Sequence, residues 1–190
     1  MMEEDSLERY NFLMKEVKFH RKKKEYKLAE EYAEQACSLA IDENQKRYSS
    51  YIYWNSRAKR LESEEDFSEA AECYKQSGDV IANINEKLGF GEYSNYYKCL
   101  ALSETDPKKA ENYFDRAIRL AEKGKDKQGE YYLRALKYEH LSKFESDKEK
   151  KLEYLEKAKK YYIEGEHKKS AEVVKFLINE IKRKRKAPYT

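Results

Sequence analysis

Residues that commonly carry catalysis or bind metals are sparse in this sequence. The three histidines lie far apart and lack a cysteine or carboxylate at metal-site spacing: His20, His140 and His167. No glycine-rich phosphate loop, Ser-His-Asp arrangement or pair of catalytic carboxylates stands out. The acidic run at 63–69 is better explained as a loop followed by a helix N-terminus, where negative charge is favourable. The sequence therefore predicts a chain without catalytic activity, metal or cofactor.

The spacing of apolar residues predicts helices that must position any functional side chain. One stripe repeats at intervals of four and three: Trp54, Ala58 and Leu61. After a short acidic break, a second stripe repeats at three, four and three: Phe67, Ala70, Tyr74 and Ser77. Each stripe marks one face of a helix with 3.6 residues per turn. The stretch therefore predicts two helices joined by a tight turn, with small Ala58 where they cross and Trp54 largely buried between neighbouring hairpins.

The rest of the chain can be laid out as copies of this hairpin. Corresponding positions in the four second helices are Ala29, Ala70, Ala110 and Lys151, which are 41, 40 and 41 residues apart. Either Thr105 or Asp106 can cap one of these helices, with Pro107 in its first turn. A last apolar stripe follows Gly165. The pattern predicts four hairpins followed by one further helix.

This pattern resembles the tetratricopeptide (TPR) repeat over about residues 10–163. The resemblance is carried by Trp54 followed by Ala58 in the first helix, and by Ala70 followed by Tyr74 in the second. The unit of about 40 residues exceeds the standard 34 and is similar to those of SNAP-type adaptors and kinesin light chains. The resemblance implies an all-α, right-handed α-solenoid of about four antiparallel hairpins plus a C-terminal capping helix. It also implies a non-catalytic scaffold that binds a peptide or helix of a partner protein in its concave groove.

The composition agrees with such an array. Charged residues make up 41% of the chain, and the 39% that is hydrophobic includes 18 tyrosines, so aliphatic residues suffice for narrow stripes rather than for one large core. We expect one domain over 1–184 and a basic tail at 185–190. Three cysteines without metal spacing and the lack of a long apolar stretch predict a cytoplasmic protein that does not enter a membrane. Abundant Lys and Glu with only four Gln is a thermophile-like composition.

The TPR resemblance also predicts a partner-binding surface. In that family, ligand-binding side chains lie about five positions after the tryptophan site of each first helix. If Leu13, Trp54, Tyr93 and Tyr132 hold that site, the ligand positions are Lys18, Lys59, Lys98 and Lys137. Three further side chains should lie near them: Asn11, Asn55 and Arg134. A row of cations would favour an acidic peptide, although lysines on a helix can equally pair with glutamates of a neighbouring helix.

A second class of function stays open. Arg134 and His140 form an Arg-x5-His pattern that resembles the loose Arg-x(4–6)-His motif of the all-helical HEPN ribonucleases. The basic stretch at 182–186 could also contact nucleic acid, or it could simply offset the dipole of a helix C-terminus. The overall pI near 8.5 is too mild to indicate nucleic-acid binding by itself. The alternative is therefore a helical ribonuclease or a nucleic-acid-associated protein.

Overall fold

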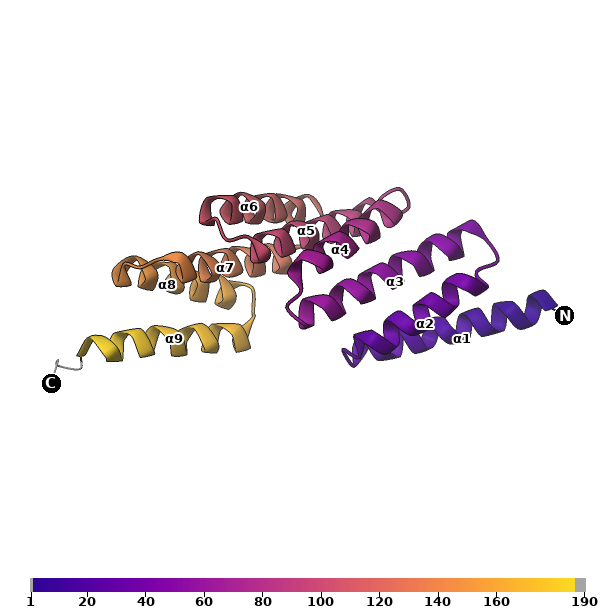
Figure 1. Ribbon diagram of the computed structural model, residues 1–190, viewed down its shortest axis with the longest axis horizontal. Helices are drawn as coiled ribbons and strands as arrows, with labels where there is room; N and C mark the ends of the chain where they lie inside the picture. The colour runs from indigo at the N-terminus through magenta and orange to yellow at the C-terminus, as the bar shows by residue number, and fades with distance from the viewer. Residues whose placement is uncertain (1, 187–190) are drawn as a thin grey trace. The chain divides into compact units, whose positions relative to one another are not determined.

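A computed structural model describes residues 2–186, with side chains described over 5–183 (Figure 1). Within these residues the fold is all-α, as predicted, with nine helices and no strand. The helices are α1 (Met2–Lys22), α2 (Tyr26–Leu39), α3 (Glu43–Ser63), α4 (Phe67–Ile81), α5 (Glu86–Ser103), α6 (Pro107–Lys123), α7 (Lys127–Phe144), α8 (Lys148–Glu164) and α9 (Lys168–Lys186). None of these described helices combines the length and the apolar character needed to cross a bilayer.

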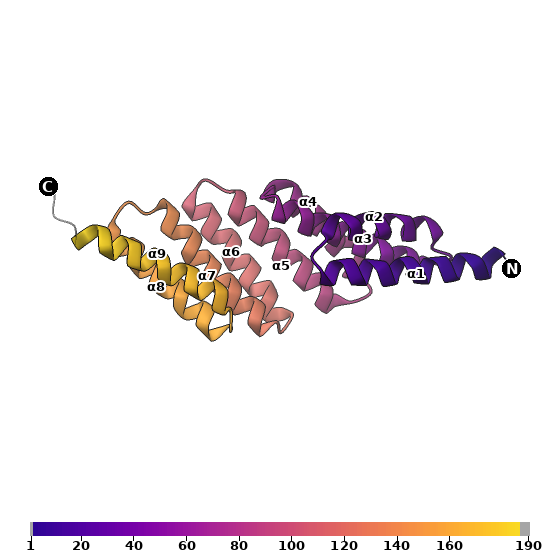
Figure 2. The ribbon, with the colours of Figure 1, turned by 90° about the horizontal axis from the view of Figure 1, so that it is seen from below.

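The chain divides into two compact units, Met1–Ser103 (unit 1) and Glu104–Thr190 (unit 2). Within each unit, every helix packs against the next one along the chain (Figures 1 and 2). This is the local packing expected of antiparallel helical hairpins. Compact units of a helical array can belong to one domain, so a single domain over 1–184 stays a prediction, as does the right-handed winding. The predicted tail at 185–190 begins within α9, and 187–190 lie outside the described residues.

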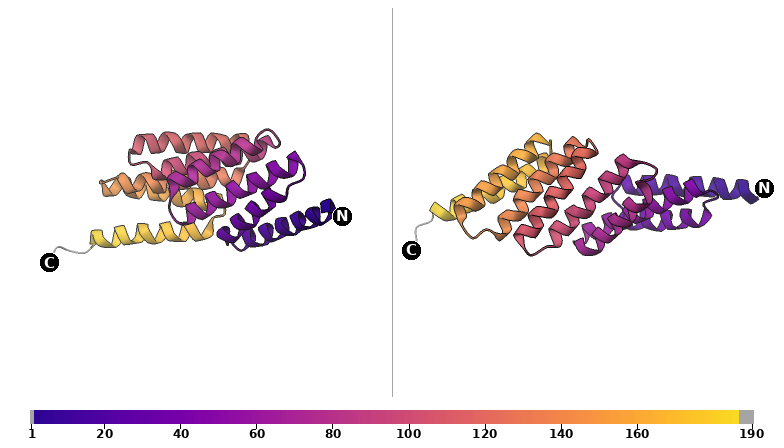
Figure 3. Two further views of the ribbon diagram at one scale, coloured as in Figure 1. Left: turned by 45° about the vertical axis from the view of Figure 1, so that its right-hand side comes forward. Right: turned by 90° about the horizontal axis from the view of Figure 1, so that it is seen from above.

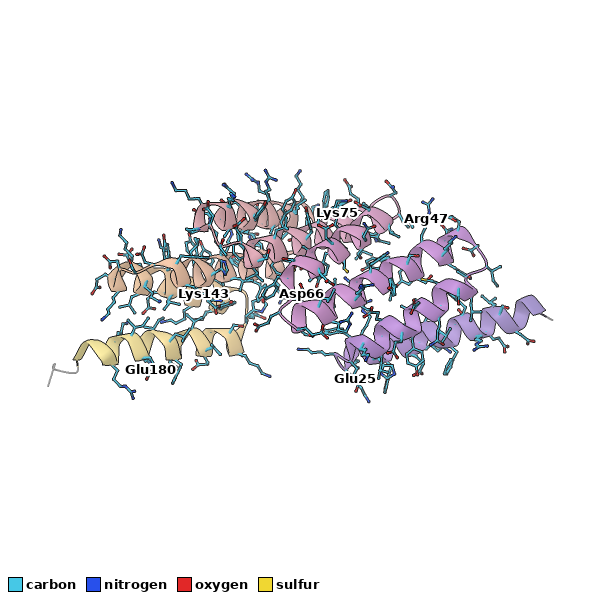
Figure 4. All side chains as sticks on the ribbon, in the orientation of Figure 1. Glu25, Arg47, Asp66, Lys75, Lys143 and Glu180 are labelled. Carbon is cyan, nitrogen blue, oxygen red and sulfur yellow. The ribbon has the colours of Figure 1, made fainter. Side chains whose placement is uncertain are left out.

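Aspartates fix the starts of five helices. In each case the side chain accepts a hydrogen bond from a backbone N–H of the first turn: Asp42, Asp66, Asp106, Asp126 and Asp147. Such caps satisfy N–H groups that have no partner inside the helix. The predicted cap at Asp106 is confirmed, with Pro107 directly after it. Figure 4 labels Asp66 at the turn between α3 and α4.

Four tight turns share one backbone geometry. Each contains a single non-glycine residue with φ between 55° and 62°: Lys24, Glu65, Lys125 and Glu166. After each, the next residue donates its backbone N–H to a carbonyl five positions earlier, as in Asp66 to Leu61 and His167 to Tyr162. These bonds satisfy the last carbonyls of the preceding helix. The two turns of each unit are 41 residues apart, which is the interval that the apolar pattern predicts.

Small residues allow the close helix crossings. In unit 1, Ala58 and Ala70 are fully buried in one cluster with Tyr74 and Cys99. This burial agrees with the predicted crossing at Ala58, because closely crossing helices need small side chains. In unit 2, a corresponding cluster joins α7, α8 and α9: Ala135, Leu152, Leu155, Ala158, Tyr162, Ala171, Val174 and Ile178. Figure 3 shows α9 lying along α8.

Trp54 is of intermediate burial, and its position between neighbouring hairpins stays a prediction. One side of its indole packs against the cluster around Ala58, and Tyr53 contacts it edge-on at 5.0 Å between ring centroids. The other side lines a surface cavity of about 640 Å³ between α3 and α4. Polar and charged side chains such as Arg57 and Gln76, rather than a further hairpin, form the rest of that cavity.

Candidate functional site

A groove in unit 1 brings together two of the lysines that the sequence singled out. Most of its lining residues belong to α1 and α3, which run in the same direction (Figure 1). Tyr10 donates to the backbone carbonyl of Gln45, and Arg21 donates to Asn55, so a residue of α1 faces the residue about 34 positions later in α3. The groove has a volume of about 550 Å³, within the roughly 300–1,000 Å³ typical of ligand sites. It is lined by Met14, Val17, Lys18, Arg21, Lys22, Tyr26, Tyr48, Ile52 and Lys59.

Four of the lining side chains are cations: Lys18, Arg21, Lys22 and Lys59. None of the described lining residues is a carboxylate, and none of the four cations lies within 4.0 Å of a described carboxylate. The nearby acid Glu25, labelled in Figure 4, is instead 2.6 Å from Nδ1 of His20. The lining of the groove therefore carries an excess of positive charge, which Glu62 and Glu92 offset in part because both interact electrostatically with Lys59, and Glu92 also with Arg21.

Lys59 is the most unusual of the four. It is half-buried on α3 and lies four residues before the end of the helix at Ser63, where the helix dipole favours a positive charge. Its ammonium lies 5.9 Å from the ring centroid of Tyr26. Burial lowers the pKa of Lys59, and the neighbouring cations Lys98 and Arg21 lower it further, against the opposing effect of Glu62 and Glu92. A bound anion beside Lys59 would oppose this lowering of its pKa.

A buried polar chain holds Arg21 in place. Its Nη2 donates to Oδ1 of Asn55 at 2.6 Å, and Nδ2 of Asn55 donates to both carboxylate oxygens of Glu92 at 2.8 and 2.9 Å. Asn55 is 2% exposed and Glu92 is 5% exposed. Burial raises the pKa of Glu92. Burial and the nearby charge of Glu92 raise the pKa of Tyr51 to about 12. Asn55 therefore links α1, α3 and α5 beneath the groove rather than facing a ligand.

Lys98 lies in a buried ion pair. It is 6% exposed, and its Nζ lies 2.6 Å from Oε1 of Glu62, whose other oxygen accepts a hydrogen bond from Tyr74 at 2.7 Å. These contacts lower the pKa of Glu62 against the effect of its burial. The alternative considered for the lysines, pairing with a glutamate of another helix, holds for Lys98.

The two predicted cations of unit 2 are also paired. Lys137 lies 2.9 Å from Glu111 and 2.8 Å from Asp115, both on α6. Arg134 lies 3.0 Å from Glu130 and 2.7 Å from Glu122. Their assignment as partner-binding residues stays a prediction, as does that of Asn11, which is exposed on α1 and does not line the groove.

Arg134 and His140 occupy different environments on α7. Arg134 is partly exposed, whereas His140 is 6% exposed and lies between the rings of Phe114 and Phe144 at centroid distances of 5.7 and 5.2 Å. Neither ring nitrogen of His140 makes a hydrogen bond of good geometry with the described residues, although the backbone of Glu104 is close enough to favour the charged form. Burial lowers the pKa of His140, and the positive charge of Lys143 lowers it further. The two residues of the Arg-x5-His pattern therefore differ in exposure, and their role as a catalytic pair stays a prediction.

The sequence did not single out Arg21, Lys22, Tyr26 and Tyr48 as groove residues. Arg21 and Lys22 belong to a basic run at the end of α1, and such a run is explained well enough by the helix dipole. The available signal was their spacing: Lys18, Arg21 and Lys22 are three and four positions apart and so share one face.

Within the described residues, no group of three or more His, Cys, Asp or Glu side chains could hold a metal ion. No protein-family model and no curated protein matches the chain. The case for a function therefore depends on the groove itself.

Proposed function

We propose that this chain is a non-catalytic, TPR-like scaffold whose unit 1 binds an acidic segment of a partner protein. The observation that carries the proposal is the groove between α1 and α3, in which four cations meet without a lining carboxylate. Such a surface attracts anionic ligands over a distance and neutralises them on contact. The half-buried Lys59 strengthens the case, because burial outweighs the effect of Glu62 and Glu92 and lowers its pKa, so that a bound anion would stabilise its charged form.

The proposal is tested by titrating fluorescein-labelled peptides rich in Asp and Glu against the wild-type protein and the Lys18→Glu/Lys59→Glu variant. Fluorescence anisotropy at about 150 mM salt limits the contribution of distant charges, since the Debye length is then about 8 Å. We expect the charge reversal to weaken binding at least tenfold, because two attractive contacts become repulsive.

The matched control is Lys46→Glu/Lys87→Glu, which changes the net charge of unit 1 equally at exposed lysines outside the groove. This control should bind within about threefold of wild type, because screened charges away from the groove contribute little. Equal affinities for the groove variant and the control variant would refute the proposal.

A further inference from the structure

The two ends of the groove differ in chemistry. Because α1 and α3 run in the same direction, Met14 lies level with Tyr48 at one end, and this end also includes the apolar Val17 and Ile52. Tyr48 is 47% exposed, so its ring is available to a ligand. The groove therefore has an apolar floor toward the starts of the two helices.

The cations begin beside the apolar set and continue toward the ends of the two helices. Lys18 lies level with Ile52, Arg21 and Lys22 lie in the last turns of α1, and Lys59 lies beside Tyr26. The centre of the four cations is about six residues beyond that of the apolar set, which is about 9 Å at about 1.5 Å per residue. A ligand that fills the groove would therefore combine an anion with an apolar group about 9 Å away.

An extended peptide meets this requirement at one spacing. In a polyproline II conformation, three residues complete a turn and advance the chain by about 9 Å, so side chains three positions apart point the same way. In a regular β-strand they would point to opposite sides. Positions i and i+3 of a polyproline II segment thus match both the separation and the common direction of the two ends.

We propose that the groove recognises an extended segment in which an acidic side chain and a large apolar side chain are three positions apart. The acidic group lies among Arg21, Lys22 and Lys59, and the apolar group packs on Met14 and Tyr48. This inference rests on the proposed function and adds the sequence pattern that the partner must carry. A nucleic-acid strand fits less well, because its phosphates repeat along the whole length and would leave the apolar end without a matching group.

The experiment compares four labelled peptides of equal length and charge. Two of them carry one Asp pair and a Phe three positions away, with the Phe before the pair in one peptide and after it in the other. The third carries Phe next to the Asp pair, and the fourth has Ala in place of Phe. We expect one of the first two to bind wild type at least tenfold more tightly than the Ala peptide, since burying an aromatic side chain contributes that much or more.

A double-mutant cycle then assigns the apolar contact to its site. In Tyr48→Ser, the Phe and Ala peptides should bind within about twofold of each other, while Lys18→Glu/Lys59→Glu should weaken both. Because Tyr48 is 47% exposed, its truncation leaves the core intact, and circular dichroism checks this. Peptides in which phosphoserine replaces the Asp pair test whether the anion is a phosphate.

The outcomes show whether this inference fails alone or together with the proposed function. Equal binding of the Phe and Ala peptides to wild type would overturn this inference and leave the proposed function standing. A Phe preference that persists in Tyr48→Ser, or tighter binding when Phe is next to Asp, would also overturn it. Tighter binding of the phosphoserine peptides would replace the carboxylate by a phosphate and so overturn the stated chemistry. Failure of every acidic peptide to bind would overturn both proposals.

Discussion

Replacing Asn55 by leucine tests whether the buried polar chain stabilises unit 1. Leucine has a similar volume but removes the acceptor of Arg21 and the donor to both oxygens of Glu92. Hydrogen bonds to charged groups contribute about 1.5–3 kcal/mol each, and the buried carboxylate is left without its main donor. After the gain from a buried leucine, we expect Asn55→Leu to lower the free energy of unfolding by about 3 kcal/mol.

The assay is urea denaturation followed by tryptophan fluorescence. Trp54 is the single tryptophan of the chain and lies in unit 1, so its signal reports on that unit alone. With an m-value of about 1.5 kcal/mol/M, the expected loss moves the urea midpoint down by about 2 M. A decrease of less than about 1 kcal/mol would refute the argument that Asn55 holds these groups together.

The matched control is Asn55→Leu/Glu92→Met, which removes the carboxylate as well. Replacing both partners of a buried hydrogen bond costs less than leaving one of them unsatisfied, so the double variant should be more stable than Asn55→Leu alone. If the two losses simply added, the residues would not be coupled.

The contribution of Glu92 to stability also depends on pH. Because burial raises the pKa of Glu92, its contribution to stability is present below its unfolded pKa of about 4.3 and is lost as pH rises through the folded pKa.

Four further outcomes are expected. The wild type should lose thermal stability as pH falls from about 6.5 through the lowered pKa of the buried His140. His140→Phe should remove this loss, which circular dichroism melts at pH 7.5 and 5 would measure. Ala58→Leu should overpack the α3–α4 crossing and cost about 1–3 kcal/mol in urea denaturation; an unchanged midpoint would contradict the packing. Purified protein should not cleave RNA, and any activity that Arg134→Ala and His140→Ala both abolish would favour the ribonuclease alternative. Deleting 182–190 should abolish any nucleic-acid binding, which should also fall steeply with salt; salt-insensitive binding by the truncated protein would contradict a role for this tail.

The helices could be predicted from the sequence because their signals are local. Apolar stripes mark the buried face of each helix, and the cap at Asp106 with Pro107 fixes a start within a few positions. The burial of Ala58 and Ala70 agrees with their assignment to a crossing, since closely crossing helices need small side chains. The partial exposure of Trp54 could not be predicted, because it depends on which side chains border the indole in space.

The site was predicted only in part, because ion pairs join residues that are distant along the chain. Spacing places Lys98 on a face of α5, but its partner Glu62 is 36 residues earlier and no local pattern connects them. Asn55 was expected beside a lysine on the groove, whereas it binds Arg21 and Glu92 beneath it. Sequence periodicity predicts which face of a helix a residue lies on, whereas the neighbouring helices determine which cations on that face have an ion-pair partner.

Three lysines of unit 1 occupy corresponding positions on α1, α3 and α5 but differ in burial and in ion pairing. Lys18 is exposed and well solvated, and Lys98 is buried with its charge matched by Glu62. Lys59 lies between these extremes: it is half-buried, no described carboxylate lies within 4.0 Å of it, and Glu62 and Glu92 act on it from farther away. Water already satisfies an exposed lysine, and a glutamate already satisfies a paired one, so neither gains much from a ligand. An anion that reaches Lys59 supplies the counter-charge that burial has made valuable, which is why binding at this groove should depend on Lys59 more than on any other predicted lysine.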